Sequence, residues 1–187
     1  EAFSQLNRIC VGLDFAETLR LIDCLSHELN VDIPNTVGEG FEPVTWEELR
    51  EMQSHRIEIG AHSKTHPILS RITPDQARAE VVGVKARLEE KLGGPVFSYC
   101  YPNGRYGDVT QHVVELVKDA GYHCAVLSEG GWDGCGPYRI PRIAAVDDDM
   151  IFRWCLYGFE ALFSIPGGSV SATVESASTK TRSHVDA

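Results

Sequence analysis

Apolar positions along the chain fall into two alternating patterns, helically spaced residues and short continuous runs bounded by turn residues. The first pattern predicts amphipathic helices and the second predicts buried strands. Helices are expected over residues 13–29, 45–54, 73–92, 109–120 and 147–163. Strands are expected over residues 56–62, 96–101, 123–127 and 139–144. Because strands that are separated by helices pair in parallel, an α/β fold is the expected class.

Two of the expected helices begin at the same type of start signal. Thr45-Trp46-Glu47-Glu48 and Thr73-Pro74-Asp75-Gln76 each place a threonine three residues before a glutamate or glutamine, which is a capping box. Pro74 also stands at the first helical position, where its missing N–H costs nothing. Gly93-Gly94 and Gly121 follow the last apolar positions of two helices and predict where these helices end.

Two segments differ in composition from the rest of the chain. A loop rich in Gly and Pro follows the first helix, over residues 34–43. From Pro166 onward the composition shifts to Ser, Thr, Gly and Val, which leaves little to bury and predicts a mobile tail. The 187 residues are enough for one domain with a core of its own.

The net charge is −10, from 17 basic and 27 acidic residues, which argues against binding to nucleic acid or to an anionic membrane surface. Neutral or partly cationic glycans remain compatible with this charge. No apolar run approaches the length that spans a bilayer. None of the six cysteines forms a Cys-x-x-Cys pair, so a cysteine zinc site is not expected, and their even number permits disulfides without requiring them.

Two histidines four residues apart follow the strand expected over residues 56–62. His62 and His66 stand in a short segment that ends at Pro67. Neutral imidazoles are common ligands of transition metals, and two of them from one segment can form one edge of a metal site. The alternative is a pair of loop histidines that face water. A second motif after the next strand, Ser98-Tyr99-Cys100-Tyr101-Pro102-Asn103-Gly104, favours a shared site at the strand ends.

Together these segments resemble the polysaccharide deacetylase (NodB-homology) family, which is carbohydrate esterase family four. The His-Ser-x-x-His-Pro motif of that family is matched by His62, Ser63, His66 and Pro67. Its aromatic-x-Tyr-Pro-x-Gly motif is matched by Tyr99, Tyr101, Pro102 and Gly104. The resemblance runs from about Thr45 to Phe163 and implies an α/β fold, a distorted and incomplete (β/α) barrel of the NodB-homology type.

The resemblance also implies how the chain is divided. Residues 1–44 are expected to be a helical insertion segment and loop, residues 45–165 a NodB-like deacetylase domain that lacks its first strands, and residues 166–187 the mobile tail. The first motif of the family, Thr-Phe-Asp-Asp-Gly, has no match, and Gly12-Leu13-Asp14-Phe15 fits better as the acidic start of a helix. The chain, which begins at Glu1, is therefore expected to be an N-terminally truncated member of the family.

By this resemblance, His62 and His66 are the expected ligands of a divalent metal, with zinc the expected ion. Such an ion polarises an amide carbonyl and lowers the pKa of its water toward ~7. The backbone amide of Tyr101 is the expected oxyanion donor, and such a donor contributes on the order of 3 kcal/mol to the transition state. Pro102 and Asn103 are expected to contact the substrate.

Two further residues are assigned by their place in the family pattern. Trp132 either lines the acetyl pocket or anchors a loop. The Leu-x-His motif that supplies a general acid in many members is replaced by Arg139-Ile140-Pro141-Arg142-Ile143. Arg142 is expected near the site, where it would orient a carboxylate.

The expected function of the parent protein is metal-dependent deacetylation of N- or O-acetylated carbohydrate, with this fragment impaired because the acid pair is missing. One alternative is a hydrolase of other C–N bonds in small molecules. Another is a non-catalytic glycan-binding module. The residues encoded upstream discriminate them, because Thr-Phe-Asp-Asp-Gly there would favour the enzyme. The sequence leaves the sugar, the compartment and the oligomeric state open.

Overall fold

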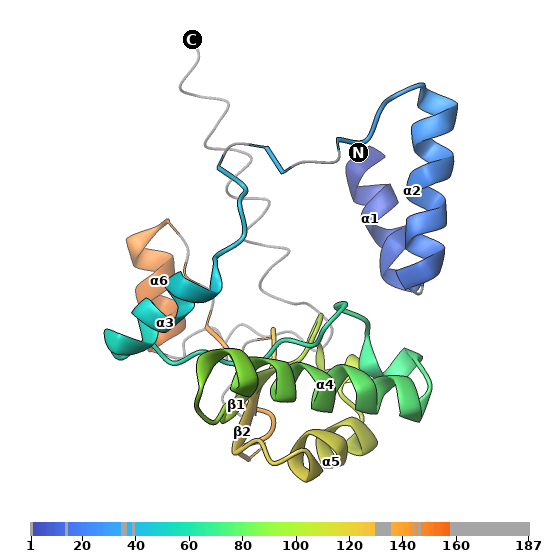
Figure 1. Ribbon diagram of the computed structural model, residues 1–187. Helices are drawn as coiled ribbons and strands as arrows, with labels where there is room; N and C mark the ends of the chain where they lie inside the picture. Colours follow the sequence, from blue (N-terminus) through green and yellow to red (C-terminus); the bar gives the residue numbers. More distant parts are fainter. Residues whose placement is uncertain are drawn as a thin grey trace.

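The computed structural model describes residues 2–13, 15–34, 37–38, 40–129, 136–143, 145 and 147–157. Within these residues the elements follow one another as α1 (Ala2–Gly12), α2 (Phe15–Leu29), α3 (Trp46–Ser54), η1 (Leu69–Arg71), α4 (Pro74–Leu92), β1 (Ser98–Cys100), η2 (Tyr106–Asp108), α5 (Gln111–Asp119), β2 (Cys124–Val126) and α6 (Asp149–Leu156) (Figure 1). The expected tail over residues 166–187 and the end of the last expected helix lie outside the described residues.

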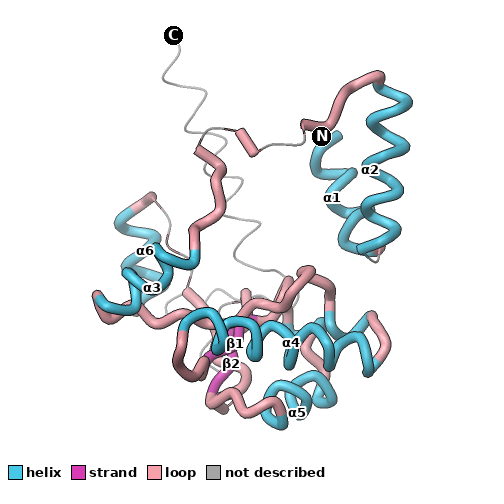
Figure 2. The backbone as a smooth tube through the Cα atoms, in the orientation of Figure 1, coloured by secondary structure: helices cyan, strands magenta, loops and turns pink. Residues whose placement is uncertain are grey.

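The sheet is parallel, as the alternation of strands and helices predicts. β1 pairs with β2 in register, Tyr99 opposite Ala125. Single parallel bridges extend the pair on both sides, from Ala61 to Tyr99 and from Val126 to Ile140. Figure 2 shows the two short strands lying side by side behind α4. The parallel α/β arrangement is therefore confirmed, whereas these elements do not by themselves close a barrel.

Two of the expected strands are wrong in extent. In the expected strand over residues 56–62 only Ala61 pairs, and in the one over residues 139–144 only Ile140 pairs. After Ile140 the regular pairing stops, because the Arg142 N–H donates to the Glu129 carbonyl at 3.3 Å and the Leu127 carbonyl accepts the Arg142 side chain instead. Before Ala61, residues 57–60 run without a ladder partner among the described segments. Apolar runs predict strand character, but a ladder also requires a neighbouring backbone.

The hydrophobic core lies between the sheet and helices α4 and α5. It is built from buried residues of all these elements: Ala61, Leu69, Ala77, Val81, Val96, Tyr99, Tyr101, Val109, Val113, Leu116, Val117, Tyr122, Ala125 and Leu127. None of the described side chains of α1, α2 or α3 belongs to this core. In Figure 1, α1 and α2 lie apart from the α/β body.

Tyrosines in and beside the core are joined by ring contacts and by hydrogen bonds from their hydroxyls. The rings of Tyr99 and Tyr122 lie 5.1 Å apart, and those of Tyr99 and Tyr101 lie 5.5 Å apart. The hydroxyl of Tyr101 donates to the carbonyl of Tyr138 at 3.0 Å, and that of Tyr138 donates to the carbonyl of Tyr122 at 2.9 Å. Burial raises the pKa of the Tyr99, Tyr101 and Tyr122 phenols, so all three remain neutral donors at physiological pH.

The start and stop signals of the sequence hold in α4. Thr73 and Gln76 form the expected capping box, with Pro74 in the first turn. Gly93 ends the helix in a left-handed conformation, φ 72°, which glycine adopts without a steric penalty. The apolar side of the helix carries Ala77 and Val81 into the core, so α4 is fixed both at its ends and along its length.

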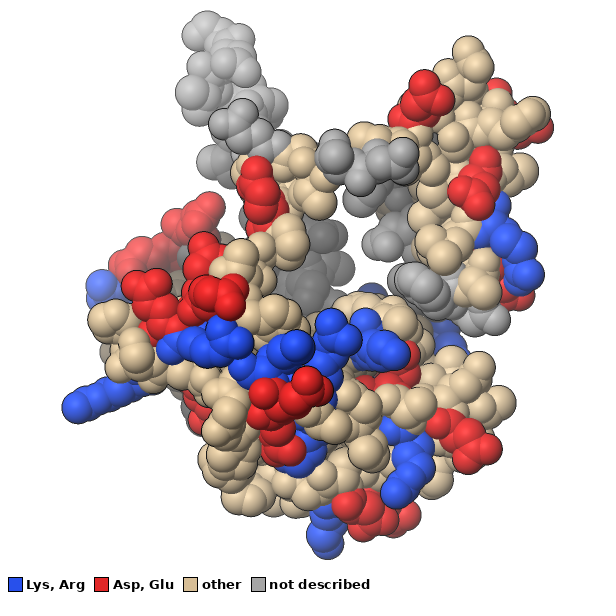
Figure 3. All heavy atoms as spheres, in the orientation of Figure 1, with Lys and Arg blue, Asp and Glu red and all other residues tan. Residues whose placement is uncertain are grey.

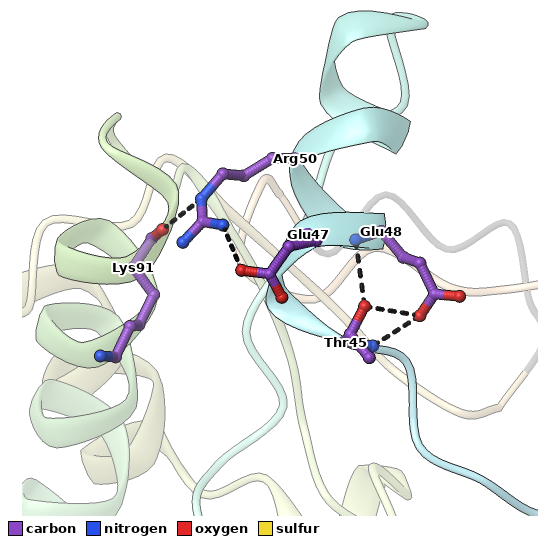
Figure 4. A network of polar contacts seen from close by, with 5 residues as sticks. All are labelled: Thr45, Glu47, Glu48, Arg50 and Lys91. Atoms are coloured by element: carbon purple, nitrogen blue, oxygen red, sulfur yellow. Dashed lines mark hydrogen bonds and ion pairs between the residues drawn. The ribbon is translucent and has the colours of Figure 1, made fainter.

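Helix α3 begins at the other expected capping box, formed by Thr45 and Glu48. Figure 4 shows how it is attached to α4. The Nε of Arg50 donates to the carbonyl of Lys91 at 3.0 Å, and its guanidinium pairs with Glu47 at 3.0 Å. A cation beside the carbonyls that end a helix is a favourable placement. The Arg50–Lys91 bond joins α3 to α4, while Trp46, Leu49 and Met52 of α3 are half-buried and none of its side chains is fully buried.

On the face drawn in Figure 3, basic side chains form a short row that is flanked by acidic side chains. Charges of both signs therefore share this face. None of the helices that the structure describes combines the length and the apolar character needed to cross a membrane. The five cysteines among the described residues are free thiols.

We expect the charge of Glu89 to stabilise the fold only above acidic pH. Its carboxylate accepts the Val96 N–H at 3.0 Å and pairs with Lys85 at 2.9 Å, and these two contacts lower its pKa. The contribution is complete above the ordinary glutamate pKa of 4.5 and is lost as pH falls through the lower folded-state pKa.

Glu89→Gln should therefore lower the free energy of unfolding at pH 7 by less than about 1 kcal/mol, since the pair is partly exposed. The difference from wild type should shrink in urea titrations at pH 3. Glu90→Gln is the control, because Glu90 is exposed and its ion pair with Lys91 is long, at 3.9 Å. A Glu89 effect that is equally large at both pH values would contradict the assignment.

Candidate metal centre

The first histidine is placed by backbone bonds to β1. The Ala61 N–H donates to the Ser98 carbonyl at 3.0 Å, and the Cys100 N–H donates to the Ala61 carbonyl at 2.8 Å. His62 therefore leaves the sheet at the carboxyl end of β1. Gly60 allows this close approach, because a Cβ there would lie 2.7 Å from the Ser98 hydroxyl oxygen.

The imidazole of His62 has one nitrogen committed and one available. Its Nδ1 lies 2.8 Å from the Cys100 carbonyl oxygen. A carbonyl oxygen only accepts hydrogen bonds, so Nδ1 carries the proton and the neutral ring presents a lone pair at Nε2. This is the arrangement that orients metal-binding histidines in general.

His66 lies beside it. The two ring centroids are 4.8 Å apart, with an angle of 77° between the ring planes, and both residues are exposed. Two imidazoles at this separation and open to solvent fit as two ligands of one divalent transition ion. No group of three or more His, Cys, Asp or Glu residues suited to a metal occurs within the described part of the chain.

The loop between the histidines has an unusual backbone that is held from outside. Ser63 and His66 adopt positive φ values of 55° and 61°. For a residue with a Cβ this region costs roughly 1–2 kcal/mol. The Ser63 hydroxyl accepts the His66 N–H at 3.0 Å, and the carboxylate of Glu80 on α4 accepts hydrogen bonds from Lys64 and Thr65.

Tyr101 lies at the end of β1, beside the histidines, with its side chain in the core. Its N–H donates to the Val126 carbonyl at 3.2 Å, as part of the pairing of β1 with β2. The amide expected to hold an oxyanion is thus already bonded within the sheet. What Tyr101 provides in this arrangement is an anchor for the turn that follows.

That turn is fastened to the residue after β2. Asn103 and Gly104 both have φ 57°. The Gly104 carbonyl accepts the Ser128 N–H at 2.9 Å, and the Ser128 hydroxyl donates to the Asn103 carbonyl. Pro102 and Asn103, the expected substrate contacts, are thereby held at the same end of the sheet as the histidines.

Arg142 also reaches this end of the sheet. Its Nε donates to the Leu127 carbonyl, directly after β2. Burial raises the pKa of the Cys100 thiol, and the positive charge of Arg142 partly opposes this rise. The guanidinium is therefore close to the residue whose carbonyl orients His62.

Three further residues differ in how they relate to this cluster. Trp132 lies outside the described residues. His123 precedes β2, at the amino end of the sheet, where its ring lies 4.7 Å from that of Phe97. Glu80 was not singled out from the sequence, because a glutamate inside a helix carries no signal of what it contacts across 15 residues.

The sequence profile of the family described as "Polysaccharide deacetylase" matches residues 27–125, just over half of the chain. The chain therefore belongs to the polysaccharide deacetylase family. The matched region contains both histidines and the turn that follows β1.

Individual proteins are also similar to parts of the chain. YxkH of Bacillus subtilis (strain 168), a polysaccharide deacetylase by name, is 31% identical over 88 residues, which are 47% of this chain and 30% of YxkH. The deacetylase PplD of Streptococcus pyogenes superposes with a TM-score of 0.55 at 22% identity, over 65% of this chain and 52% of PplD. IcaB of Ammonifex degensii gives 0.51 at 18%, over 70% of this chain and 64% of IcaB.

At these identities the two solved structures establish a shared fold. The chain spans under a third of YxkH and about half of PplD.

Gly104 offers a direct stability test of the turn. We expect Gly104→Ala to lower the free energy of unfolding by about 2–4 kcal/mol, through left-handed strain and overpacking together. The added Cβ would lie 2.8 Å from the Ser128 nitrogen and 2.9 Å from the Tyr101 carbonyl oxygen.

Two other glycines separate the two causes. Gly121 has φ 79° with open space around it, so Gly121→Ala should cost only the strain, about 1 kcal/mol. Gly107 has neither constraint, so Gly107→Ala should be near neutral. Urea denaturation of the three variants measures this order, and equal effects at Gly104 and Gly121 would contradict the close packing of the turn.

Proposed function

We propose that this chain supplies the histidine half of a metal-dependent deacetylase that acts on N- or O-acetylated carbohydrate. Family membership supports the reaction class. The observation that carries the metal dependence is the His62 ring, which donates through Nδ1 to the Cys100 carbonyl and leaves Nε2 available beside His66.

His62 and His66 would hold the ion, with zinc the choice that best suits two imidazoles. A bound divalent ion supplies Lewis acidity toward an acetyl carbonyl. The described residues place no carboxylate with the two histidines. In this proposal a further ligand and the base that takes a proton from water would lie outside the described residues. Hydrolysis then releases acetate and leaves a free amine or hydroxyl on the sugar.

The remaining site residues have supporting roles in this proposal. Pro102 and Asn103 border the substrate on the turn after β1, and Trp132 is assigned to the acetyl pocket. Arg142, whose charge is close to Cys100, would orient the carboxylate base. An oxyanion role for the Tyr101 amide requires it to give up its bond to the Val126 carbonyl.

The domain assignment follows the same reasoning. Residues 45–165 would form the NodB-type domain, with residues 1–44 as a helical insertion. Residues 57–60 lead into Ala61 at the edge of the sheet without a ladder partner of their own, and Ile57 is 51% exposed. An apolar, unpaired edge is a favourable place for further parallel strands that would complete a (β/α) barrel.

We expect the 187-residue chain by itself to release no acetate from a chitooligosaccharide or an acetylated ester above the background of its His62→Ala variant. A missing base and a missing ligand act as a unit, so their losses are not additive. Acetate release with and without a chelator measures this. Turnover that is abolished both by the chelator and by His62→Ala would show that another carboxylate substitutes.

We also expect the chain to bind zinc weakly and in a pH-dependent manner. Metal and protons compete for the imidazole nitrogens, so affinity should fall about tenfold or more between pH 7.5 and pH 5.5. His66→Ala should remove most of the binding, since one imidazole is a poor site. Calorimetric titration at both pH values measures this.

His123→Ala is the matched control, because His123 is an exposed histidine at the opposite end of the sheet. It should bind zinc as wild type does. Equal binding by wild type and His66→Ala would place the metal elsewhere and remove the main physical support for the proposed function.

A further inference from the structure

One carboxylate accepts three hydrogen bonds from the loop that joins the two histidines. Glu80 Oε2 accepts the N–H of Lys64 at 2.6 Å and the N–H of Thr65 at 2.8 Å. Glu80 Oε1 accepts the hydroxyl of Thr65 at 2.7 Å. Bonds to an ionised acceptor are roughly twice as strong as neutral ones, and all three act on two adjacent residues.

Within the loop itself, the Ser63 hydroxyl accepts the His66 N–H at 3.0 Å. Lys64 is exposed and Thr65 is half-buried, and the residues on either side of them, Ser63 and His66, both have positive φ. Two left-handed residues so close together are costly, and they persist only where surrounding contacts hold them. The Glu80 bonds join the middle of this loop to α4.

Helix α4 is a rigid support for such a contact. Ala77 and Val81, one turn before Glu80 and directly after it, are 2% and 0% exposed in the core. A capping box starts the helix and a left-handed glycine ends it. Movement of the Glu80 carboxylate is therefore limited by the core, and the loop is limited in turn.

We propose that Glu80 is a positioning residue that sets the relative orientation of the His62 and His66 rings through the Lys64–Thr65 backbone. This inference rests on the proposed metal site for its role in zinc binding. The orientation of the rings can be tested without metal. A plain loop anchor, in contrast, would affect stability and leave both the rings and the zinc affinity unchanged.

Two substitutions separate hydrogen bonding from charge. Glu80→Ala removes all three bonds. Glu80→Gln can keep them, because its Oε1 accepts both amides while its Nε2 donates to the Thr65 hydroxyl, which is able to accept. Glu89→Ala is the matched control, since Glu89 is a half-buried carboxylate on the same helix that accepts the Val96 N–H and does not contact the loop.

The first measurement is calorimetric titration with zinc alone, on fully folded protein at pH 7.5. We expect Glu80→Ala to bind roughly tenfold to a hundredfold more weakly, the range typical of residues that orient a ligand. Glu80→Gln should bind close to wild type, and Glu89→Ala should match wild type even where it lowers the unfolding midpoint. Wild-type affinity in Glu80→Ala would overturn the proposal.

The second measurement is made without metal, by NMR of the imidazole ¹⁵N and ring ¹H resonances. We expect the His62 and His66 signals to shift in Glu80→Ala, to return in Glu80→Gln and to stay in place in Glu89→Ala. Unchanged rings in Glu80→Ala would overturn the proposal. If wild type binds no zinc but the rings still shift, the proposed metal function fails while the positioning role stands.

Discussion

The candidate site depends on a three-residue strand that forms hydrogen bonds on both of its sides. On one side β1 forms a parallel bridge with Ala61, and on the other side it pairs with β2. Cys100, its last residue, donates its N–H to the Ala61 carbonyl and offers its own carbonyl to His62. The segment that carries His62 and the turn after β1 are thus joined directly to this strand, and a change in its register would displace them together.

The rigidity of this arrangement comes from the core on which β1 lies. Tyr99 and Tyr101 are buried, and the hydroxyl of Tyr101 is bonded to a backbone carbonyl. The Tyr99 hydroxyl is buried without a partner within the described residues, which is an unusual cost at the centre of a core. Ala77 and Val81 of α4 belong to the same buried cluster as these tyrosines, and the Tyr122 hydroxyl donates to the Val81 carbonyl at 3.1 Å. The helix that holds the histidine loop and the strand that holds His62 therefore share one core.

The two histidines of the matched region would not by themselves balance the charge of a divalent ion. The matched region contains two imidazoles in a suitable arrangement, and the chain spans only 30% of YxkH. Two neutral ligands leave the charge of a divalent ion uncompensated, so a carboxylate contributes more to such a site than a third imidazole would. In the proposed site, this electrostatic need would be met by a carboxylate from outside the described residues.

Local signals determined much of the fold. The capping boxes at Thr45 and Thr73, and the glycine that ends α4, specify helix boundaries because they act within a few residues. The two histidines and the Tyr-Pro-x-Gly turn could likewise be recognised as motifs. Strand extent could not, since residues 57–60 and the segment around Ile140 depend on which backbones lie beside them. Three contacts of the site join residues that lie 15 to 38 positions apart: the bond of the Tyr101 amide to Val126, the Nδ1 bond of His62 and the contact of Glu80 with the histidine loop. Only tertiary packing decides such pairs.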